Sequence, residues 1–168
     1  MPKGLKQTSS LITISSSVTE SAIDTFTQAR VDLQLNPLDN EVFVVQAINM
    51  DPSPPDIQTN LNSFVTCSMS TNSRTTVGTL ADTAVLSAAS RDIRADAVSA
   101  VSFEQTSMET PPAALEYIGI ISTNDFFLQI LGGNNLQTKD LRVKVYGYRA
   151  RADASTYAAL VQSEVLSA

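Results

Sequence analysis

The sequence contains no histidine and only one cysteine, Cys67. Histidine is the commonest general base and the commonest metal ligand, so Ser-His-Asp and Cys-His catalytic arrangements are excluded. One cysteine cannot supply the ligands of a zinc site, and it cannot form an intrachain disulfide. We expect Cys67 to be a small buried side chain in a strand. The sequence therefore predicts a protein that needs no cofactor and is not an enzyme.

Tryptophan is also absent, and aromatic residues make up only 6% of the chain. Proteins that bind or cleave carbohydrates usually stack sugars on aromatic faces, so this composition disfavours both classes. Asp92 with Asp96, and Glu104 with Glu109, have the residue types of a glycosidase carboxylate pair. Each lies in a polar stretch, where a solvated carboxylate is the default interpretation.

Basic residues are scarce. Lys and Arg total 11 against 17 Asp and Glu, which gives a formal net charge of −6. Nucleic-acid binders usually carry a basic face or tail, because neutralising phosphates supplies most of the affinity. Lys3 and Lys6 are the only lysines near the N-terminus, too few for a genome-binding arm. We expect no direct contact with nucleic acid, although Arg142, Arg149 and Arg151 form one local basic cluster.

Long apolar runs are missing as well. The short stretch Leu11–Ile14 has Ser-rich flanks and does not resemble the core of a secretory signal. No segment approaches the length needed to cross a bilayer. We therefore expect the protein to be synthesised and assembled inside a cell.

Hydroxyl side chains take the place of the missing charge. Ser and Thr number 37, while charged residues make up 17% of the chain. Threonine suits a pleated sheet and serine favours turns. At 168 residues the chain has the size of one domain and can bury roughly two-thirds of its unfolded surface. The composition favours a single β-rich domain that needs no disulfide or metal.

Two segments near opposite ends of the chain alternate strictly between apolar and polar residues. Leu141, Val143 and Val145 alternate with polar neighbours within Asp140–Tyr148, and the same pattern runs through Ala29–Leu35. This is the period of a strand with one buried and one solvated face. Such strands require long-range antiparallel pairing, so the sequence predicts an all-β sandwich.

Further strands are predicted where apolar or alternating runs lie between turn residues, for a total of eight or nine. These runs are Leu11–Ile14, Glu41–Met50, Ser63–Ser70, Ala97–Met108, Leu115–Ser122 and Asp125–Leu131. Asp82–Ile93 is compatible with either a helix turn or a strand. Ser15–Ser17 and the proline-rich Asp51–Asp56 are predicted loops.

The chain divides into a flexible N-terminal arm (residues 1–10), a sandwich (11–150) and a C-terminal helix or tail (151–168). Within the last part, Asp153–Leu166 has apolar residues at helical spacing and predicts a short amphipathic helix. We expect this helix to pack on its own sandwich, with docking on a neighbouring copy as the alternative.

Two groups of residues are candidates for function. Asp39, Asp51 and Asp56 lie in turns where oxygen ligands for calcium could gather, although turn chemistry alone explains such residues. Tyrosine and arginine are enriched at protein contacts, and residues of both types share a strand face near the C-terminus. The alternative interpretation is that these side chains simply cover the outer face of their own sheet. The predicted interface consists of Arg142, Lys144, Tyr146 and Tyr148 on that strand and of Tyr157, Leu160 and Val161 on the helix.

The order of elements resembles that of a single jelly-roll capsid protein of an icosahedral virus. An N-terminal arm precedes about eight strands, a proline-rich loop and a short C-terminal tail, in a Ser/Thr-rich and lysine-poor chain. The resemblance covers residues 11–149 and is architectural, without a diagnostic motif. It implies two four-stranded sheets packed face to face, in many copies that form a closed shell. Strand order is not predictable here, so an immunoglobulin-like sandwich is the alternative fold.

The resemblance also implies partners and a location. The partners would be copies of the chain and other capsid proteins, in a virion assembled in the host cytoplasm. Capsid proteins that touch a naked genome often carry a basic arm, which residues 1–10 lack. We therefore expect an internal membrane or another protein layer over a double-stranded DNA genome. A β-sandwich adhesion, spike or carbohydrate-binding module is the alternative function.

Overall fold

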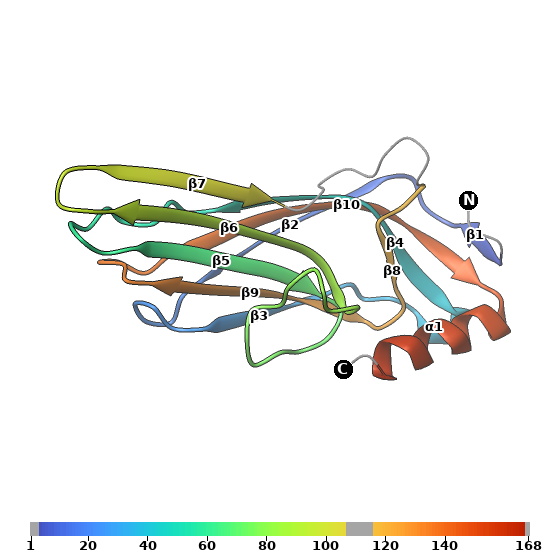
Figure 1. Ribbon diagram of the computed structural model, residues 1–168. Helices are drawn as coiled ribbons and strands as arrows, with labels where there is room; N and C mark the ends of the chain where they lie inside the picture. Colours follow the sequence, from blue (N-terminus) through green and yellow to red (C-terminus); the bar gives the residue numbers. More distant parts are fainter. Residues whose placement is uncertain (1–3, 107–115, 167–168) are drawn as a thin grey trace.

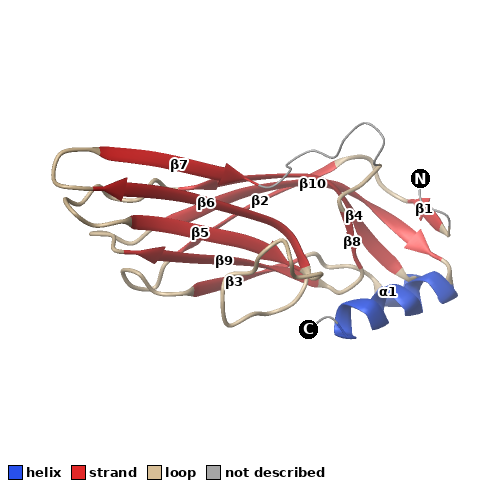
Figure 2. Cartoon of the chain, viewed as in Figure 1, coloured by secondary structure: helices blue, strands red, loops and turns tan. Residues whose placement is uncertain are grey.

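A computed structural model describes residues 4–106 and 116–166, and strands dominate its regular structure (Figures 1 and 2). No helix among these residues is long and apolar enough to span a membrane. The elements are β1 (Leu5–Gln7), β2 (Ile12–Thr19), β3 (Thr27–Asp32), the 3₁₀ helix η1 (Pro37–Asp39), β4 (Glu41–Pro52), β5 (Ser63–Ser70), β6 (Val85–Ala95), β7 (Ala100–Thr106), β8 (Gly119–Ile121), β9 (Asp125–Gly133), β10 (Asp140–Ala152) and the helix α1 (Ala154–Leu166).

The strands pair in a nested order. β2 pairs with β10, β3 with β9, β4 with β8 and β5 with β6, all antiparallel. One sheet has the order β2-β10-β4-β8, with β1 continuing the β2 edge along β10, and the other has the order β3-β9-β5-β6-β7. Successive pairs, counted from the outermost, thus belong to alternate sheets, which is the jelly-roll arrangement.

The predicted antiparallel all-β sandwich with a jelly-roll order is therefore confirmed. An immunoglobulin-like order is ruled out because the strand after the N-terminal segment pairs with the last strand of the chain. The described residues form ten strands instead of eight or nine. The additional strand is β1, a short addition to one sheet, whereas β7, the outer strand of the other, corresponds to the predicted strand Ala97–Met108.

Four local predictions need correction or completion. Asp51 and Pro52, the start of the predicted loop Asp51–Asp56, are the last two residues of β4 and pair with β10. Leu5–Gln7 lies in the predicted flexible arm but pairs with the end of β10, because Leu5 is buried against the apolar surface there. Ser15–Ser17 is not a loop but the middle of β2, where hydroxyls are tolerated because the strand lies at a sheet edge. The segment Asp82–Ile93, left between helix and strand, forms strand β6 from Val85 onward.

The core lies between the two sheets. β4 contributes alternate side chains to it, and β9 does so from the opposite sheet. Cys67 on β5 is buried in this core, as predicted, and burial raises the pKa of its thiol to about 12. The largest side chains that are fully buried here include Phe43, Ile48, Met69, Ile121, Phe126, Leu128 and Ile130.

A bulge in β4 lets both ends of this long strand contribute to the core. The register against β10 shifts between Tyr146 and Gly147, so that Tyr146 faces Ala47 and Gly147 faces Val45. One extra residue on β4 reverses which face successive side chains occupy. As a result Val45 and Ile48, three positions apart, both point into the core.

The outer face of the same sheet is covered by α1 at one end of the sandwich (Figure 2). Val42 and Val44 on β4 are fully buried, and the helix residues Tyr157 and Leu160 pack against the same cluster. The predicted helix is confirmed, and it packs on its own chain. Tyr148, predicted as an interface residue, is also buried in this cluster and is 7% exposed.

A carboxylate in the last turn of α1 fixes the helix to the sandwich. Glu164 is buried, and its two carboxylate oxygens accept the backbone N–H groups of Ser122 at 2.9 Å and Thr123 at 2.8 Å. Its backbone carbonyl accepts the Asn72 side chain at 2.8 Å. A negative charge is unfavourable at a helix C-terminus, so these buried contacts explain its position.

We expect Glu164→Gln to lower the free energy of unfolding by about 2 kcal/mol, since the amide cannot accept both N–H groups. The amides of α1 should also exchange faster with solvent, because the helix loses its anchor. Hydrogen exchange and denaturant unfolding measure both effects. Ser163→Ala, at the exposed neighbouring position, is the control. Unchanged exchange in Glu164→Gln would contradict the anchoring role.

Candidate functional site at the loop end of the sandwich

Three loops meet at the end of the sandwich opposite α1 (Figure 1, left). They are the β2–β3 loop (residues 20–26), the β4–β5 loop (53–62) and the β9–β10 loop (134–139). Their sequences are rich in Asp, Asn, Ser and Pro, which favour turns over strands. Hydrogen bonds between the loops hold them together, and we call this region the loop end.

Glu20 joins the first loop to the third. Its side chain is 4% exposed, and its carboxylate accepts the backbone N–H groups of Gly132 at 2.6 Å and Lys139 at 2.8 Å. The Glu20 N–H donates to the Lys139 carbonyl at 2.9 Å. A buried carboxylate that accepts two charge-assisted hydrogen bonds is a strong local constraint.

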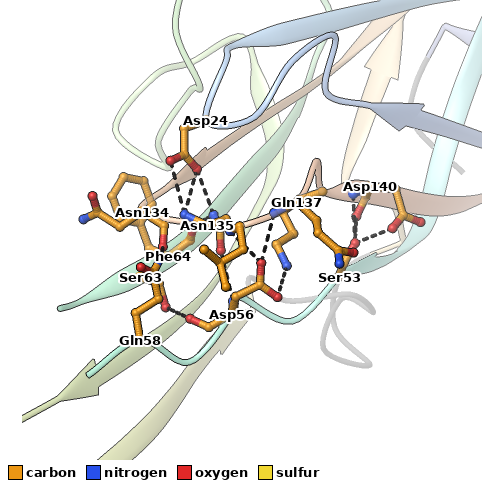
Figure 3. Close-up of polar contacts among 12 residues, drawn as sticks. Asp24, Ser53, Asp56, Gln58, Ser63, Phe64, Asn134, Asn135, Gln137 and Asp140 are labelled. Carbon is orange, nitrogen blue, oxygen red and sulfur yellow. Dashed lines mark hydrogen bonds and ion pairs between the residues drawn. The ribbon is translucent and has the colours of Figure 1, made fainter. Parts of the chain in front are cut away.

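Asn135 connects all three loops (Figure 3). Its amide oxygen accepts the Asp56 N–H at 3.1 Å, and its amide nitrogen donates to the Phe64 carbonyl at 3.0 Å. Asp24 accepts both the side-chain amide and the backbone N–H of Asn135, each at 3.1 Å. The amide group thus uses both its donor and its acceptor capacity inside the loop end.

Asp56 and Lys139 form a largely buried ion pair in the same region. Lys139 Nζ lies 2.8 Å from Asp56 Oδ1, with side-chain exposures of 6% and 28%. The second carboxylate oxygen accepts the N–H groups of Leu136 at 2.9 Å and Gln137 at 3.3 Å. The hydrogen bond from the Lys139 ammonium is the main reason why the pKa of Asp56 lies below its ordinary value.

The braced loops carry exposed aliphatic side chains. Ile23 extends from the first loop, Ile57 and Leu61 from the second, and Leu136 from the third. Ile57 and Leu136 are 69% and 63% exposed, although each lies next to a residue of the polar network. Aliphatic groups held on a rigid frame in contact with water are typical of surfaces that bind other proteins.

The calcium candidates lie in separate ion pairs. Asp39 contacts Arg151 at 2.5 Å, Asp51 contacts Arg91 at 3.4 Å, and Asp56 contacts Lys139. Within the described ranges, no group of three or more Asp, Glu, Cys or His side chains could hold a metal. The structure therefore does not bring Asp39, Asp51 and Asp56 together into one site.

Apart from the buried Tyr148, the strand part of the predicted interface is at least partly exposed. Arg142 and Lys144 are exposed and Tyr146 is half-buried. Arg142 forms an ion pair with Asp140 of the same chain at 2.9 Å, near the start of β10. Val161 on α1 lines a cavity of about 360 Å³ together with Tyr157, so it faces its own chain.

Two of the carboxylates considered for glycoside hydrolysis, Asp96 and Glu104, have other roles in the structure. Asp96 accepts the N–H groups of Val98 at 2.8 Å and Ser99 at 2.7 Å in the β6–β7 turn, and these bonds lower its pKa. Glu104 pairs with Arg91 at 3.0 Å. Glu109 lies outside the described residues.

Of the loop-end network, sequence reasoning identified only Asp56, and as a calcium candidate. Glu20, Asn135 and Lys139 lie in polar stretches, and nothing in the local pattern marks them as buried. The sequence signal that could have indicated a contact surface here is the pair of aliphatic residues Ile57 and Leu136, since each stands alone among turn residues. Recognising them required knowledge of which loops share one end of the sandwich.

Comparison with known proteins adds no relationship for this chain. No family model matches it, and no curated protein matches it. One solved structure with a match is the tailspike protein gp49 of Acinetobacter baumannii bacteriophage Fri1, a capsular polysaccharide depolymerase. The identity is 12% and the TM-score 0.16, over 72% of this chain and 20% of the tailspike chain. This chain thus spans about a fifth of that protein, and the likeness carries no argument about fold or function.

Proposed function

We propose that this chain is a structural protein that assembles, with copies of itself and with other capsid proteins, into the shell of an icosahedral virus. The loop end carries the proposal: buried polar groups hold three loops rigidly, and Ile23, Ile57 and Leu136 remain exposed on them. A closed shell requires each copy to meet its neighbours at a fixed angle. Rigid loops meet this need because little conformational entropy is lost on contact.

The charge distribution supports a layer between this shell and the genome. Arg142, Arg149 and Arg151, the basic cluster identified in the sequence, pair with Asp140, Glu41 and Asp39 respectively. Neutralised arginines offer little to phosphate groups. We therefore include an internal membrane or a further protein layer over double-stranded DNA in the proposal. Salt-sensitive DNA binding by the purified protein would count against this part of it.

Assembly of the purified chain tests the proposal directly. Light scattering after size exclusion and negative-stain imaging at rising concentration should show rings or closed particles. Ile57→Lys combined with Leu136→Lys should abolish these assemblies without changing the unfolding midpoint, because both side chains are exposed. Leu38→Lys is the matched control, since Leu38 is 94% exposed on η1 at the opposite end.

Two results would overturn the proposal. The first is a wild-type chain that stays monomeric at every concentration and binds a glycan, which would favour the adhesion or carbohydrate-binding alternative. The second is normal assembly of the double lysine variant, which would show that the loop end is not the contact surface.

A further inference from the structure

β7 is an edge strand that lacks the usual protection against pairing with another chain. It pairs with β6 on one side, and no strand among the described residues pairs with its other side. The register runs without a bulge from Ala95 opposite Ala100 to Ala89 opposite Thr106. The strand sequence, AVSFEQT, contains neither lysine nor proline. A regular edge of this kind presents free backbone donors and acceptors to a further strand.

Two of the other edges, β8 and β3, are protected in ordinary ways. β8 is only three residues long. β3, the opposite edge of the sheet that contains β7, exposes Arg30 and Asp32. Short strands and charged side chains are the devices by which natural sheets avoid edge-to-edge association. β7 therefore differs from β3 in composition and from β8 in length. The edge strand β2 also lacks charge, but all its exposed side chains are Ser or Thr, whereas β7 exposes apolar ones.

β7 exposes two large apolar side chains. Val101 and Phe103 lie on the outer face of the sheet and are 54% and 51% exposed. Arg94 of the neighbouring strand stacks over the Phe103 ring at 5.5 Å. The one charged residue of β7, Glu104, lies on the other face and pairs with Arg91. The strand thus presents apolar groups beside its free edge, with its single charge already paired.

We propose that β7 pairs antiparallel with β7 of a second copy of this chain, around a two-fold axis that passes through Ser102. In this register Val101 lies opposite Phe103 of the second copy, twice, and Glu104 lies opposite Ala100. Apolar cross-strand pairs stabilise a sheet, and no like charges meet in this arrangement. An isologous contact of this kind joins two sheets into one continuous sheet. The inference rests on the proposed function in taking a copy of the same chain as the partner.

A charged variant tests the contact. Val101→Lys combined with Phe103→Lys places lysines along the strand, and we expect the dissociation constant of the dimer to rise by about tenfold or more. Sedimentation equilibrium measures it. Leu38→Lys is the matched control, because Leu38 is 94% exposed on η1, outside β7 and the β6–β7 turn. Equal dissociation constants for the double variant and the wild type would overturn the proposal.

Cysteine cross-linking tests the register independently of any loss of folding. Cys67 is buried with a pKa near 12, so the native chain gives almost no background reaction. Ser102→Cys should form a covalent dimer under mild oxidation, since the two sulfurs would lie opposite each other. Ser17→Cys, exposed on β2 of the other sheet, should remain monomeric. Equal cross-linking of both variants, or none of Ser102→Cys, would overturn the proposed pairing.

Failure of this inference is distinguishable from failure of the shell proposal. Particles that form equally well with the lysine double variant of β7 would refute the β7 contact and leave the shell role intact. Dimers that depend on β7, without rings or particles at any concentration, would support the contact and refute the shell role.

Discussion

Replacing Asp56 by Asn is expected to lower the free energy of unfolding by about 2–3 kcal/mol at neutral pH. The variant leaves the Lys139 ammonium, whose side chain is 6% exposed, without its carboxylate partner. Breaking a fully buried ion pair costs about 3–5 kcal/mol, and the 28% exposure of Asp56 reduces that figure. Denaturant unfolding of the variant and the wild type measures the difference.

The same pair makes the stability of the protein depend on pH. The folded state holds the pKa of Asp56 below its ordinary value of 3.8, so the ion pair contributes fully to stability above pH 3.8. This contribution is lost as the pH falls through the folded pKa. We therefore expect the stability difference between the wild type and Asp56→Asn to shrink in this acid range. A difference that stays constant throughout it would contradict the assignment.

Asp51→Asn is the control for this prediction. Asp51 also faces an arginine, Arg91, but at 3.4 Å and with its side chain 54% exposed. Solvent screens such a pair, so the expected loss is under about 1 kcal/mol. If the two aspartate variants lost equal stability, burial of Lys139 would not be the cause.

Replacing Gly147 by Ala is expected to destabilise the protein by about 3 kcal/mol. A Cβ atom at this position would lie 2.3 Å from the carbonyl oxygen of Val44 and 2.7 Å from the ring of Phe43. Both neighbours are held in place: Val44 belongs to the strand backbone beside the bulge, and Phe43 is buried in the core. The two neighbouring strands cannot move apart without disturbing the register of β4 and β10. Thermal and denaturant unfolding measure the effect.

Gly119→Ala is the matched control for the bulge. Its Cβ would lie 2.7 Å from the end of the Leu86 side chain, with no backbone atom among the near neighbours. A flexible side chain can shift, so the expected loss is under about 1.5 kcal/mol. Equal losses at Gly147 and Gly119 would show that the bulge is not the source of the constraint.

Side-chain alternation carried most of the fold prediction. The period-two patterns around Val143 and Val31 correspond to β10 and β3, and Ser63–Ser70 matches β5 without adjustment. Alternation is visible in the sequence because each such strand has one face on the core. It failed where a strand is polar on one face and partly exposed on the other, as in Ser15–Ser17 of β2.

Local patterns did not reveal which residues would serve as an interface. Tyr148, Tyr157 and Leu160 have the composition of a contact surface, yet they cover the outer face of their own sheet. Composition is the same for an internal contact and an external one, because both bury aromatic and aliphatic groups. The location of α1 relative to β4 separates the two possibilities.

The amino-acid sequence alone predicts an antiparallel β-sandwich with a C-terminal helix. It also excludes catalysis or metal binding by histidine and disfavours a strongly basic surface. These properties follow from periodicity and composition, which are local or additive. The nested strand order, the bulge that aligns Val45 with Ile48, the buried polar braces of the loop end and the unprotected edge of β7 emerge on folding. Each of them depends on partners far away in the chain, and no local pattern encodes which distant segments meet.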